Sequence, residues 1–532
     1  SPPHKELSEN LETSGVIIDN LPVGSNAIAV NAPFTSDDAT RLAINSHQPT
    51  TGPVAWYEAH IQSEEGLNIM GGLFPSSPTI GVGFNENLAW GATVNKPDLV
   101  DIFALTTNAK EPDKYLLDGK WRSFREKTIK LKVKLFGFLP WQVKRKALYT
   151  EHGPAIETPH GIYAIRYAGM GEVKQIEQWL AMNKATNFEE WLAALAQHTF
   201  ASFNFVYSDK DGNIAFIHNS MTPVRIPGYN WHNYLPGDKS SLIWDSYISF
   251  EKLPMVINPS SGYLISANQS PFFVTSDKDN PDRKNYSNED GFPTRMTNRA
   301  VRGLELLSEL DKIDERTFSA IKHDKKYSKN SRAYKYLEKA MLADLGDLNT
   351  QKHEIYANAQ TILKKWDLST DKNNRGAALG TCIIGAEWLA EQQGENPPDP
   401  SGELKRCTDL LLDKIGRIDP KWGEVNRHIR GEINVALGGG PDTLRAIYGL
   451  GLEEKGYLTN IAGDGLYYLV SWDKDKKQNV LGIHQFGSAT LDENSPHYAD
   501  QALDFANEIL HDPLFDANKR QQKLDRRYRP GQ

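Results

Sequence analysis

The stretch Gly24-Ser25-Asn26-Ala27-Ile28-Ala29-Val30, followed downstream by Asn45-Ser46-His47, is the most informative part of this chain. If the chain is cut between Gly24 and Ser25, Ser25 carries a free α-amino group beside its hydroxyl. An α-amine has a reference pKa of about 7.7–8, which suits a general base near neutral pH. One residue then holds both the nucleophile and its base. Taken alone, a Gly-Ser dipeptide is more typical of an ordinary turn that leads into a strand.

The composition is that of an ordinary globular protein, with 532 residues, 39% hydrophobic and 24% charged. The net charge is −8, so no basic excess points to a nucleic acid or an anionic membrane as partner. Two cysteines, Cys382 and Cys407, are too few for a disulfide framework or a zinc site, and whether they pair is left open. The first residues include neither Met nor an apolar leader, and we expect a processed or truncated piece.

Periodicity predicts β structure from residue 25 to about 170, including strands at 25–30 and 79–84, and a mostly helical section over about 297–440, including a helix at 315–322. Residues 1–24 read as an arm that ends in a short strand. Outside these sections the pattern predicts helices at 175–183, 188–197 and 499–510, and strands at 202–207, 214–218 and 465–472. We expect an α+β protein in which helices cover sheets.

Residues 127–135 alternate lysine and apolar residues and predict a half-exposed strand. We interpret its charge run as a solvated face whose lysines also prevent edge-to-edge pairing.

Several familiar motifs are missing or incomplete. The sequence has no Gly-x-Ser-x-Gly, Gly-x-Gly-x-x-Gly or Walker loop, which argues against an α/β-hydrolase serine or a nucleotide fold. Ser495, His497 and Asp500 lie close together, but triad partners usually come from distant segments. We interpret 495–501 as the entry to a helix, with Pro496 in its first turn.

An ordered set of motifs resembles the penicillin acylase family of N-terminal-nucleophile hydrolases. Besides the opening stretch, the set comprises Leu88-Ala89-Trp90-Gly91-Ala92-Thr93-Val94, Val100-Asp101-Ile102, Asn258-Pro259-Ser260-Ser261-Gly262-Tyr263, Ala267-Asn268-Gln269-Ser270-Pro271, Asn298-Arg299, Trp422-Gly423-Glu424-Val425, Gly438-Gly439-Gly440-Pro441-Asp442-Thr443 and Ser495–Gln501. The opening stretch is most similar to the acyl-homoserine-lactone acylase branch. The resemblance runs from Ser25 almost to the end of the chain.

The resemblance implies a four-layer αββα fold and a precursor that cuts itself before Ser25. Residues 1–24 are then a linker remnant and residues 25–532 the large subunit, whose partner is a small helical subunit from the same precursor. The family also implies a periplasmic or secreted location. It further implies a small-molecule N-acyl amide as substrate and no catalytic cofactor.

The same resemblance assigns roles to five residues. Ser25 is the nucleophile, and His47 occupies the position that supports it. The backbone N–H of Val94 and the side-chain amide of Asn268 match the donors that stabilise the oxyanion. Arg299 matches the arginine that orients this amide.

Two further sites are carried over with less detail. Asp98 and Asp101, with the Val100 carbonyl between them, resemble the family's structural calcium site, and oxygen ligands suit Ca²⁺. The family site also draws a carboxylate from the small subunit. For the acyl pocket, the sequence offers Gln48, Phe74, Ile80, Val82, Trp90 and Trp179. Gln48 departs from the aromatic residue of long-chain acylases, so the acyl preference is left open.

The sequence therefore predicts an N-terminal-serine amidohydrolase that acts on an acyl-homoserine lactone or a penicillin-type amide. One alternative is a serine hydrolase that uses Ser46 or Ser495 with a neighbouring histidine. Another is a binding protein of the same fold that never matures.

Overall fold

The computed structural model describes residues 24–488, 491–524 and 526–529. Most of the arm predicted at residues 1–24 lies outside the described residues. Within the described part of the chain, no helix has both the length and the apolar character needed to cross a membrane.

The central sheet contains the Ser25 strand. Within the described ranges nine strands form it, with β1 between β18 and β2. Its members are β1 (Gly24–Val30), β2 (Thr40–Pro49), β18 (Tyr263–Ser266), β19 (Asn426–Arg430), β20 (Ile433–Ala436), β21 (Ile447–Leu450), β22 (Leu458–Gly463), β23 (Tyr467–Trp472) and β24 (Gln478–Ile483). All seven residues of β1 are buried, because the strand is covered on both faces.

A seven-stranded sheet stacks on the central sheet. It runs in the order β17-β15-β14-β6-β5-β4-β3. Its members are β3 (Tyr57–Gln62), β4 (Asn68–Leu73), β5 (Val82–Phe84), β6 (Leu88–Thr93), β14 (Ser202–Asp209), β15 (Ile214–Ser220) and β17 (Met255–Ile257). The sheets approach closely at Gly91, where a Cβ would lie 3.2 Å from the Ala27 Cβ.

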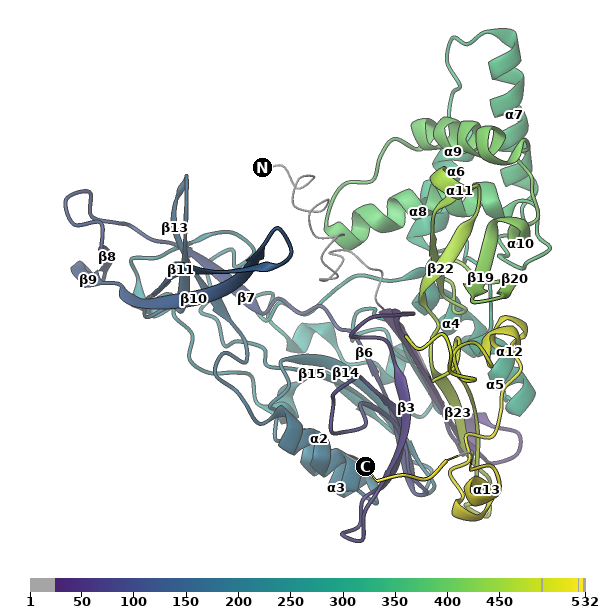
Figure 1. The fold of residues 1–532 in the computed structure, drawn as a ribbon, viewed down its shortest axis with the longest axis horizontal. Helices are drawn as coiled ribbons and strands as arrows, with labels where there is room; N and C mark the ends of the chain where they lie inside the picture. The colour runs from purple at the N-terminus through teal and green to yellow at the C-terminus, as the bar shows by residue number, and fades with distance from the viewer. Residues whose placement is uncertain (1–23, 489–490, 525, 530–532) are drawn as a thin grey trace.

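Helices cover the outer faces of both sheets (Figure 1). Helices α2 (Gln175–Lys184) and α3 (Phe188–Leu195) pack through Met182 and Trp191, respectively, on the seven-stranded sheet. On the other side, α4 (Asn298–Ser308) and α5 (Glu315–Lys322) pack against Ile28 of β1. The order helix, sheet, sheet, helix is the αββα arrangement that the sequence predicts.

A third sheet and a small ribbon extend to one side (Figure 1). Their members are β7 (Val100–Ala104), β10 (Arg125–Leu135), β11 (Leu139–Tyr149), β12 (Pro154–Thr158), β13 (Gly161–Tyr167) and β16 (Leu235–Pro236), with β8 (Lys114–Leu117) and β9 (Lys120–Ser123) forming the ribbon. All eleven residues of β10 are exposed. The strand expected at 127–135 is therefore present, but its apolar face is uncovered as well as its lysine face.

The remaining helices include a bundle with a core of its own. The helices are α6 (Arg332–Leu342), α7 (Thr350–Lys365), α8 (Ala377–Gln393), α9 (Pro400–Ile415), α10 (Trp422–Val425), α11 (Leu452–Lys455), α12 (Ala502–Asn507) and α13 (Ala517–Gln522). A Cys382–Cys407 disulfide joins α8 to α9. This pairing answers the question that the sequence leaves open.

Two expected elements are shorter in the structure. The strand expected at 79–84 begins only at Val82, because the Asn183 side chain binds both the N–H and the carbonyl of Ile80. The helix expected at 499–510 covers only Ala502–Asn507, and Glu508 ends it with a φ of +61°. Pro496 therefore lies in a turn before the helix and not in its first turn.

Candidate active site

Ser25 lies near the start of the central strand, where the pairing separates two faces. Ser25 is opposite Ser46 of β2, and Gly24 is opposite His47. Because side chains alternate along a strand, Ser25 and Ser46 share one face, while His47 shares the other with Asn45. Ser25 and the histidine predicted to support it therefore lie on opposite faces of the sheet.

A cavity of about 230 Å³ opens on the Ser25 face. Its wall combines Ser25 with aromatic side chains from α2 and from the seven-stranded sheet and its loops. Trp56 and Phe74 stack with ring centroids 4.5 Å apart, and Trp179 meets Phe200 edge to face at 4.2 Å. An apolar cavity beside a buried hydroxyl can hold an acyl group with its carbonyl at the hydroxyl.

Six residues are predicted from the sequence for the acyl pocket, and four line this cavity. These four are Gln48, Phe74, Val82 and Trp179. Ile80 and Trp90 are not among its lining residues. Both are fully buried in the main core, and Trp90 Nε1 donates to the Gly81 carbonyl behind the wall.

Asn268 links Ser25 to Val94. It follows β18 with a φ of +66°, a left-handed conformation that is uncommon outside glycine. Its Oδ1 accepts a hydrogen bond from the Ser25 backbone N–H at 2.7 Å, and its Nδ2 donates to the Val94 carbonyl at 2.7 Å. The structure thus brings these three predicted residues together, although Asn268 contacts the carbonyl of Val94 and not its N–H.

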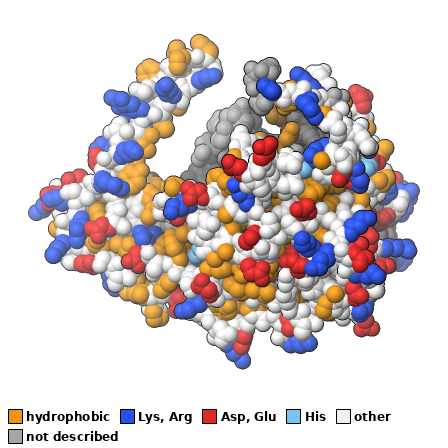
Figure 2. All heavy atoms as spheres, turned by 90° about the horizontal axis from the view of Figure 1, so that it is seen from below, with side chains coloured by type: hydrophobic (Ala, Val, Ile, Leu, Met, Phe, Trp, Pro, Cys, Tyr) orange, Lys and Arg blue, Asp and Glu red, His pale blue; other side chains and the backbone are white. Residues whose placement is uncertain are grey.

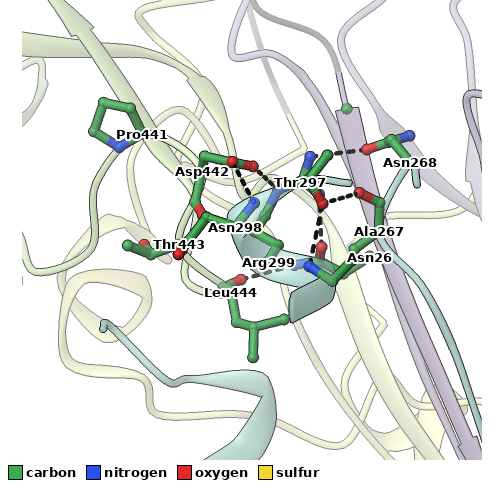
Figure 3. A network of polar contacts seen from close by, with 12 residues as sticks. Asn26, Ala267, Asn268, Thr297, Asn298, Arg299, Pro441, Asp442, Thr443 and Leu444 are labelled. Carbon is green, nitrogen blue, oxygen red and sulfur yellow. Dashed lines mark hydrogen bonds and ion pairs between the residues drawn. The ribbon is translucent and has the colours of Figure 1, made fainter. Parts of the chain in front are cut away.

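Arg299 holds this arrangement from the first turn of α4 (Figure 3). Thr297 begins the helix by accepting from the Ala300 N–H, so Arg299 points back toward β1. Its Nη1 donates to the Ser25 carbonyl at 2.6 Å, and its Nη2 donates to Asn268 Oδ1 at 2.9 Å. Arg299 therefore fixes the side-chain amide of Asn268 with its oxygen toward the guanidinium.

Asp442 neutralises Arg299, and the sequence reasoning gave it no role. Its Oδ1 lies 3.0 Å from Arg299 Nε, and its Oδ2 accepts from the Asn298 N–H at 2.7 Å. Asp442 has a φ of +57°. Its only sequence signal is its place in the Gly-Gly-Gly-Pro-Asp-Thr motif at 438–443, which marks a turn and not a charge partner.

His47 lies in a buried polar cluster behind β1. Burial lowers the pKa of His47 to about 4, although a hydrogen bond with Asp464 opposes this shift. The ring is therefore neutral at pH 7. Its Nε2 lies 3.2 Å from Asp464 Oδ1, while its Nδ1 is buried without a hydrogen-bond partner among the described residues. A neutral, half-satisfied ring can accept a proton or a hydrogen bond on its Nδ1 side.

Asp464 anchors this cluster and is a second residue that sequence reasoning missed. Burial raises the pKa of Asp464, but Lys322 and Arg445 outweigh this effect and hold that pKa well below its usual value. Its Oδ2 lies 2.5 Å from Lys322 Nζ and 2.7 Å from Arg445 Nη1. Asp464 stands in a Gly-Asp-Gly turn, which is typical of loops and carries no catalytic signal.

The peptide bond before Ser25 is closely packed. Ser25 Oγ donates a hydrogen bond to the carbonyl oxygen of Gly24. A Cβ at Gly24 would lie 3.0 Å from Asn268 Oδ1 and 3.1 Å from Arg299 Nη2. Glycine at this position therefore lets the two anchoring side chains approach the bond.

The predicted calcium ligands lie beside an arginine. Arg225 Nε lies 3.1 Å from Asp101 Oδ2, and Arg225 Nη2 lies 3.5 Å from Asp98 Oδ1. The other oxygens, Asp98 Oδ2 and Asp101 Oδ1, are buried without a hydrogen-bond partner among the described residues, with His232 Nδ1 3.3 Å from the former. Those residues contain no group of three or more His, Cys, Asp or Glu side chains placed to hold a metal.

The alternative serines have different surroundings. Ser46 lines the cavity, but its hydroxyl donates to the Ala92 carbonyl, and the His47 ring lies on the other face of the strand. His497 Nδ1 lies 2.8 Å from Asp500 Oδ2 on the surface, and Ser495 Oγ accepts from the His497 backbone N–H. Neither serine hydroxyl is hydrogen-bonded to a histidine ring.

Comparison with solved structures supports the fold. The chain superimposes on a thermostable penicillin G acylase from Alcaligenes faecalis with a TM-score of 0.66, covering 95% of this chain and 99% of that one. The sequences are 17% identical, so this likeness concerns the fold alone.

Comparison with curated sequences finds acylases. An acyl-homoserine lactone acylase PvdQ from Pseudomonas syringae pv. tomato is 23% identical over 89% of this chain and 65% of the relative. A penicillin G acylase from Escherichia coli is 33% identical over 44% of this chain and 28% of the relative. The chain thus spans about two thirds of the length of the first of these relatives. The profile of the penicillin amidase family matches residues 3–522, and the chain therefore belongs to that family.

Proposed function

We propose that this protein cuts its own chain before Ser25 and then hydrolyses N-acyl amides through the released N-terminal serine. One observation carries the proposal. The Ser25 hydroxyl lies against the carbonyl of the bond to be cut, the Ser25 nitrogen is held by Asn268, and an acyl-sized cavity opens beside both.

The self-cutting step uses the contacts around Gly24. Ser25 Oγ attacks the Gly24 carbonyl carbon and transfers its proton to the departing Ser25 nitrogen. The C–N bond breaks, and an ester forms between Gly24 and the hydroxyl. Water then hydrolyses this ester, which leaves a carboxylate on Gly24 and a free α-amine on Ser25. During this exchange Asn268 holds the Ser25 nitrogen, and Arg299 holds the Ser25 carbonyl.

Turnover repeats the same chemistry on a substrate amide. The α-amine takes the hydroxyl proton through a water molecule while Oγ attacks the amide carbonyl. The α-ammonium then protonates the leaving amine, and water releases the acid from the ester on Ser25. We assign stabilisation of the oxyanion to the side-chain amide of Asn268 and the backbone N–H of Val94. Each such donor typically lowers the activation barrier by about 2.7–4 kcal/mol. We assign His47 the task of holding the freed amine from behind, where Gly24 lies in the uncut chain.

The cavity favours a compact acyl group. A cavity of about 150 Å³ accommodates benzene, and drug-sized ligands need about 300–1,000 Å³. At about 230 Å³ with aromatic walls, this cavity suits a phenylacetyl-sized group or a short acyl chain. The relatives are named for acyl-homoserine lactones and for penicillin G, and both classes carry an amide of this kind.

The proposal includes a partner, a location and an ion. The partner is a small subunit from the same precursor, and we place the pair in the periplasm or outside the cell, as the resemblance implies. Asp98 Oδ2 and Asp101 Oδ1, which accept no hydrogen bond among the described residues, fit part of a calcium site together with the Val100 carbonyl. Calcium prefers six to eight oxygen ligands, so the remaining ligands must come from elsewhere. The ion would have a structural role, and chelation with EDTA should lower the melting temperature while leaving the Ser25 terminus intact.

The experiment follows the full-length precursor by mass spectrometry. We expect a fragment that begins at Ser25, turnover of penicillin G or an acyl-homoserine lactone, and loss of both in Ser25→Ala. Ser46→Ala is the matched control, because Ser46 lines the same cavity, and it should still mature. An intact Gly24–Ser25 bond in the purified full-length protein would favour the alternative of a binding protein that never matures. Turnover that survives in Ser25→Ala would favour the other serine hydrolase.

A further inference from the structure

The strand pair β10–β11 forms an arm that leaves the body of the protein. The two strands pair along eleven positions from Arg125 opposite Tyr149 to Leu135 opposite Leu139. Only Leu148 and Tyr149, at the base, pair onward with β12. Figure 2 shows the arm projecting from the body, with hydrophobic atoms at its end and Lys and Arg atoms along it.

The arm separates apolar and cationic residues onto two faces. On the first face the register places three apolar pairs opposite one another, namely Leu131 and Val143, Val133 and Trp141, and Leu135 and Leu139, while Ile129 on the same face lies opposite Arg145. The second face carries Lys130, Lys132 and Lys134, with Lys130 directly opposite Lys144. Two-stranded ribbons are marginally stable in water, so an uncovered apolar face of this size indicates a binding surface.

The end of the arm is apolar without interruption. Residues 135–141 read Leu-Phe-Gly-Phe-Leu-Pro-Trp. The side chains of Phe136 and Phe138 are 86% and 76% exposed, and Trp141 is 56% exposed. Gly137 makes the reversal possible with a φ of +78°. Exposed aromatic rings next to lysines are typical of segments that enter the interface of a lipid bilayer.

The charge of the arm opposes the charge of the rest of the protein. Residues 125–149 contain eight lysines and arginines and one glutamate, a net charge of +7, while the whole chain carries −8. The remaining residues therefore carry a net −15. An anionic surface attracts the arm and repels the body, so the protein approaches it with the arm first. The net charge of the whole chain predicts no membrane partner, because it adds the positive charge of the arm to the negative charge of the remaining residues and so hides their separation.

We propose that the β10–β11 arm docks the protein on an anionic lipid membrane. Phe136, Phe138 and Trp141 enter the interface, and the lysines lie against the lipid phosphates with their aliphatic stems on the acyl region. A nucleic acid would satisfy the lysines but leave the apolar end in water, which is why we favour a lipid surface. This inference goes beyond amide hydrolysis and does not depend on it.

The test is flotation of the full-length, matured protein with vesicles of phosphatidylglycerol and phosphatidylcholine, and with vesicles of phosphatidylcholine alone. We expect binding to the anionic vesicles only, weakened by added salt. The variant Lys130→Gln/Lys132→Gln/Lys134→Gln should weaken binding about a hundredfold, since each basic residue near the surface contributes a factor of about five. Phe136→Ser/Phe138→Ser should remove binding that remains at high salt.

The matched control is Lys352→Gln/Lys364→Gln/Lys365→Gln, which removes three exposed lysines from α7 and should bind like the parent protein. Lack of vesicle binding by the parent protein overturns the proposal, and so does a loss of binding in the α7 control that equals the loss in the arm lysine variant. Burial of the Phe136, Phe138 and Trp141 side chains without vesicles, measured by hydroxyl-radical footprinting, also overturns it, because another part of the full-length protein then covers the arm. Hydrolysis of a water-soluble amide without vesicles should be unchanged in both arm variants, so the outcome is separate from that of the proposed function.

Discussion

The strand pairs β1–β2 and β10–β11 have the same antiparallel pairing and opposite surroundings. Every residue of β1 is buried, and every residue of β10 is exposed. In β1 the covered faces allow one side to line the apolar cavity beside Ser25 and the other to hold charged groups away from water. In β10 neither face is covered, so the side chains of both faces are exposed to solvent. Strand pairing by itself therefore says little about function, and the layers around the strands decide it.

The largest expected effect comes from breaking the buried ion pair behind β1. Arg299→Met leaves Asp442 buried without its cation, and the Ser25 and Asn268 oxygens lose their donor. Loss of one partner of such a pair costs about 3–5 kcal/mol of unfolding free energy. Urea denaturation measures this loss, and mass spectrometry should show an uncut precursor. Lys130→Met in the arm is the control and should change neither result.

A matched leucine pair compares the two strand pairs directly. Leu42 of β2 is fully buried, and Leu131 of β10 is 45% exposed. Leu42→Ala should cost about 2–5 kcal/mol, because it leaves a cavity between the sheets. Leu131→Ala should stay within about 0.5 kcal/mol. Equal losses in the two variants would mean that the arm is covered in solution.

Acid should destabilise the Ser25 strand pair and leave the arm unaffected. Burial lowers the pKa of His47 from 6.5 to about 4, so the unfolded chain binds this proton first as the pH falls. The contribution of the neutral His47 ring to the unfolding free energy is fully present above pH 6.5. About 3 kcal/mol of unfolding free energy is lost as the pH falls toward 4. Residues 125–149 contain no histidine. The unfolding free energy of His47→Gln should fall less between pH 7 and pH 4.5 than that of the parent, and parallel curves would contradict the prediction.

The smallest expected effect is at Gly24. In Gly24→Ala the new methyl group meets Asn268 Oδ1 at 3.0 Å, so the neighbours must shift by a few tenths of an ångström. We expect self-cutting to slow by about tenfold, since misplacement near a reacting bond is costly. The time course of the Ser25 fragment measures the rate. Gly385→Ala, where a Cβ meets nothing within 4 Å, should cut at the parent rate.

The linear pattern of the sequence was sufficient for much of the fold. Helix α5 has the bounds that its periodicity predicts, and β1 begins within one residue of the expected start. Ser25, Asn268 and Arg299 were identifiable because each stands in a motif that resembles the acylase family.

The sequence by itself determined the α+β class and the Ser25 motif, because both are written in residue types and local spacing, whereas the αββα layers followed from the resemblance to the family. Only the tertiary structure decided the partners of those residues. Asp442 and Asp464 lie 143 residues from Arg299 and 417 residues from His47 in the chain, and no local pattern marks a carboxylate as the counter-ion of a distant cation. The structure also showed that the apolar face of β10 has no cover, since alternation tells which side chains share a face and not what lies against it.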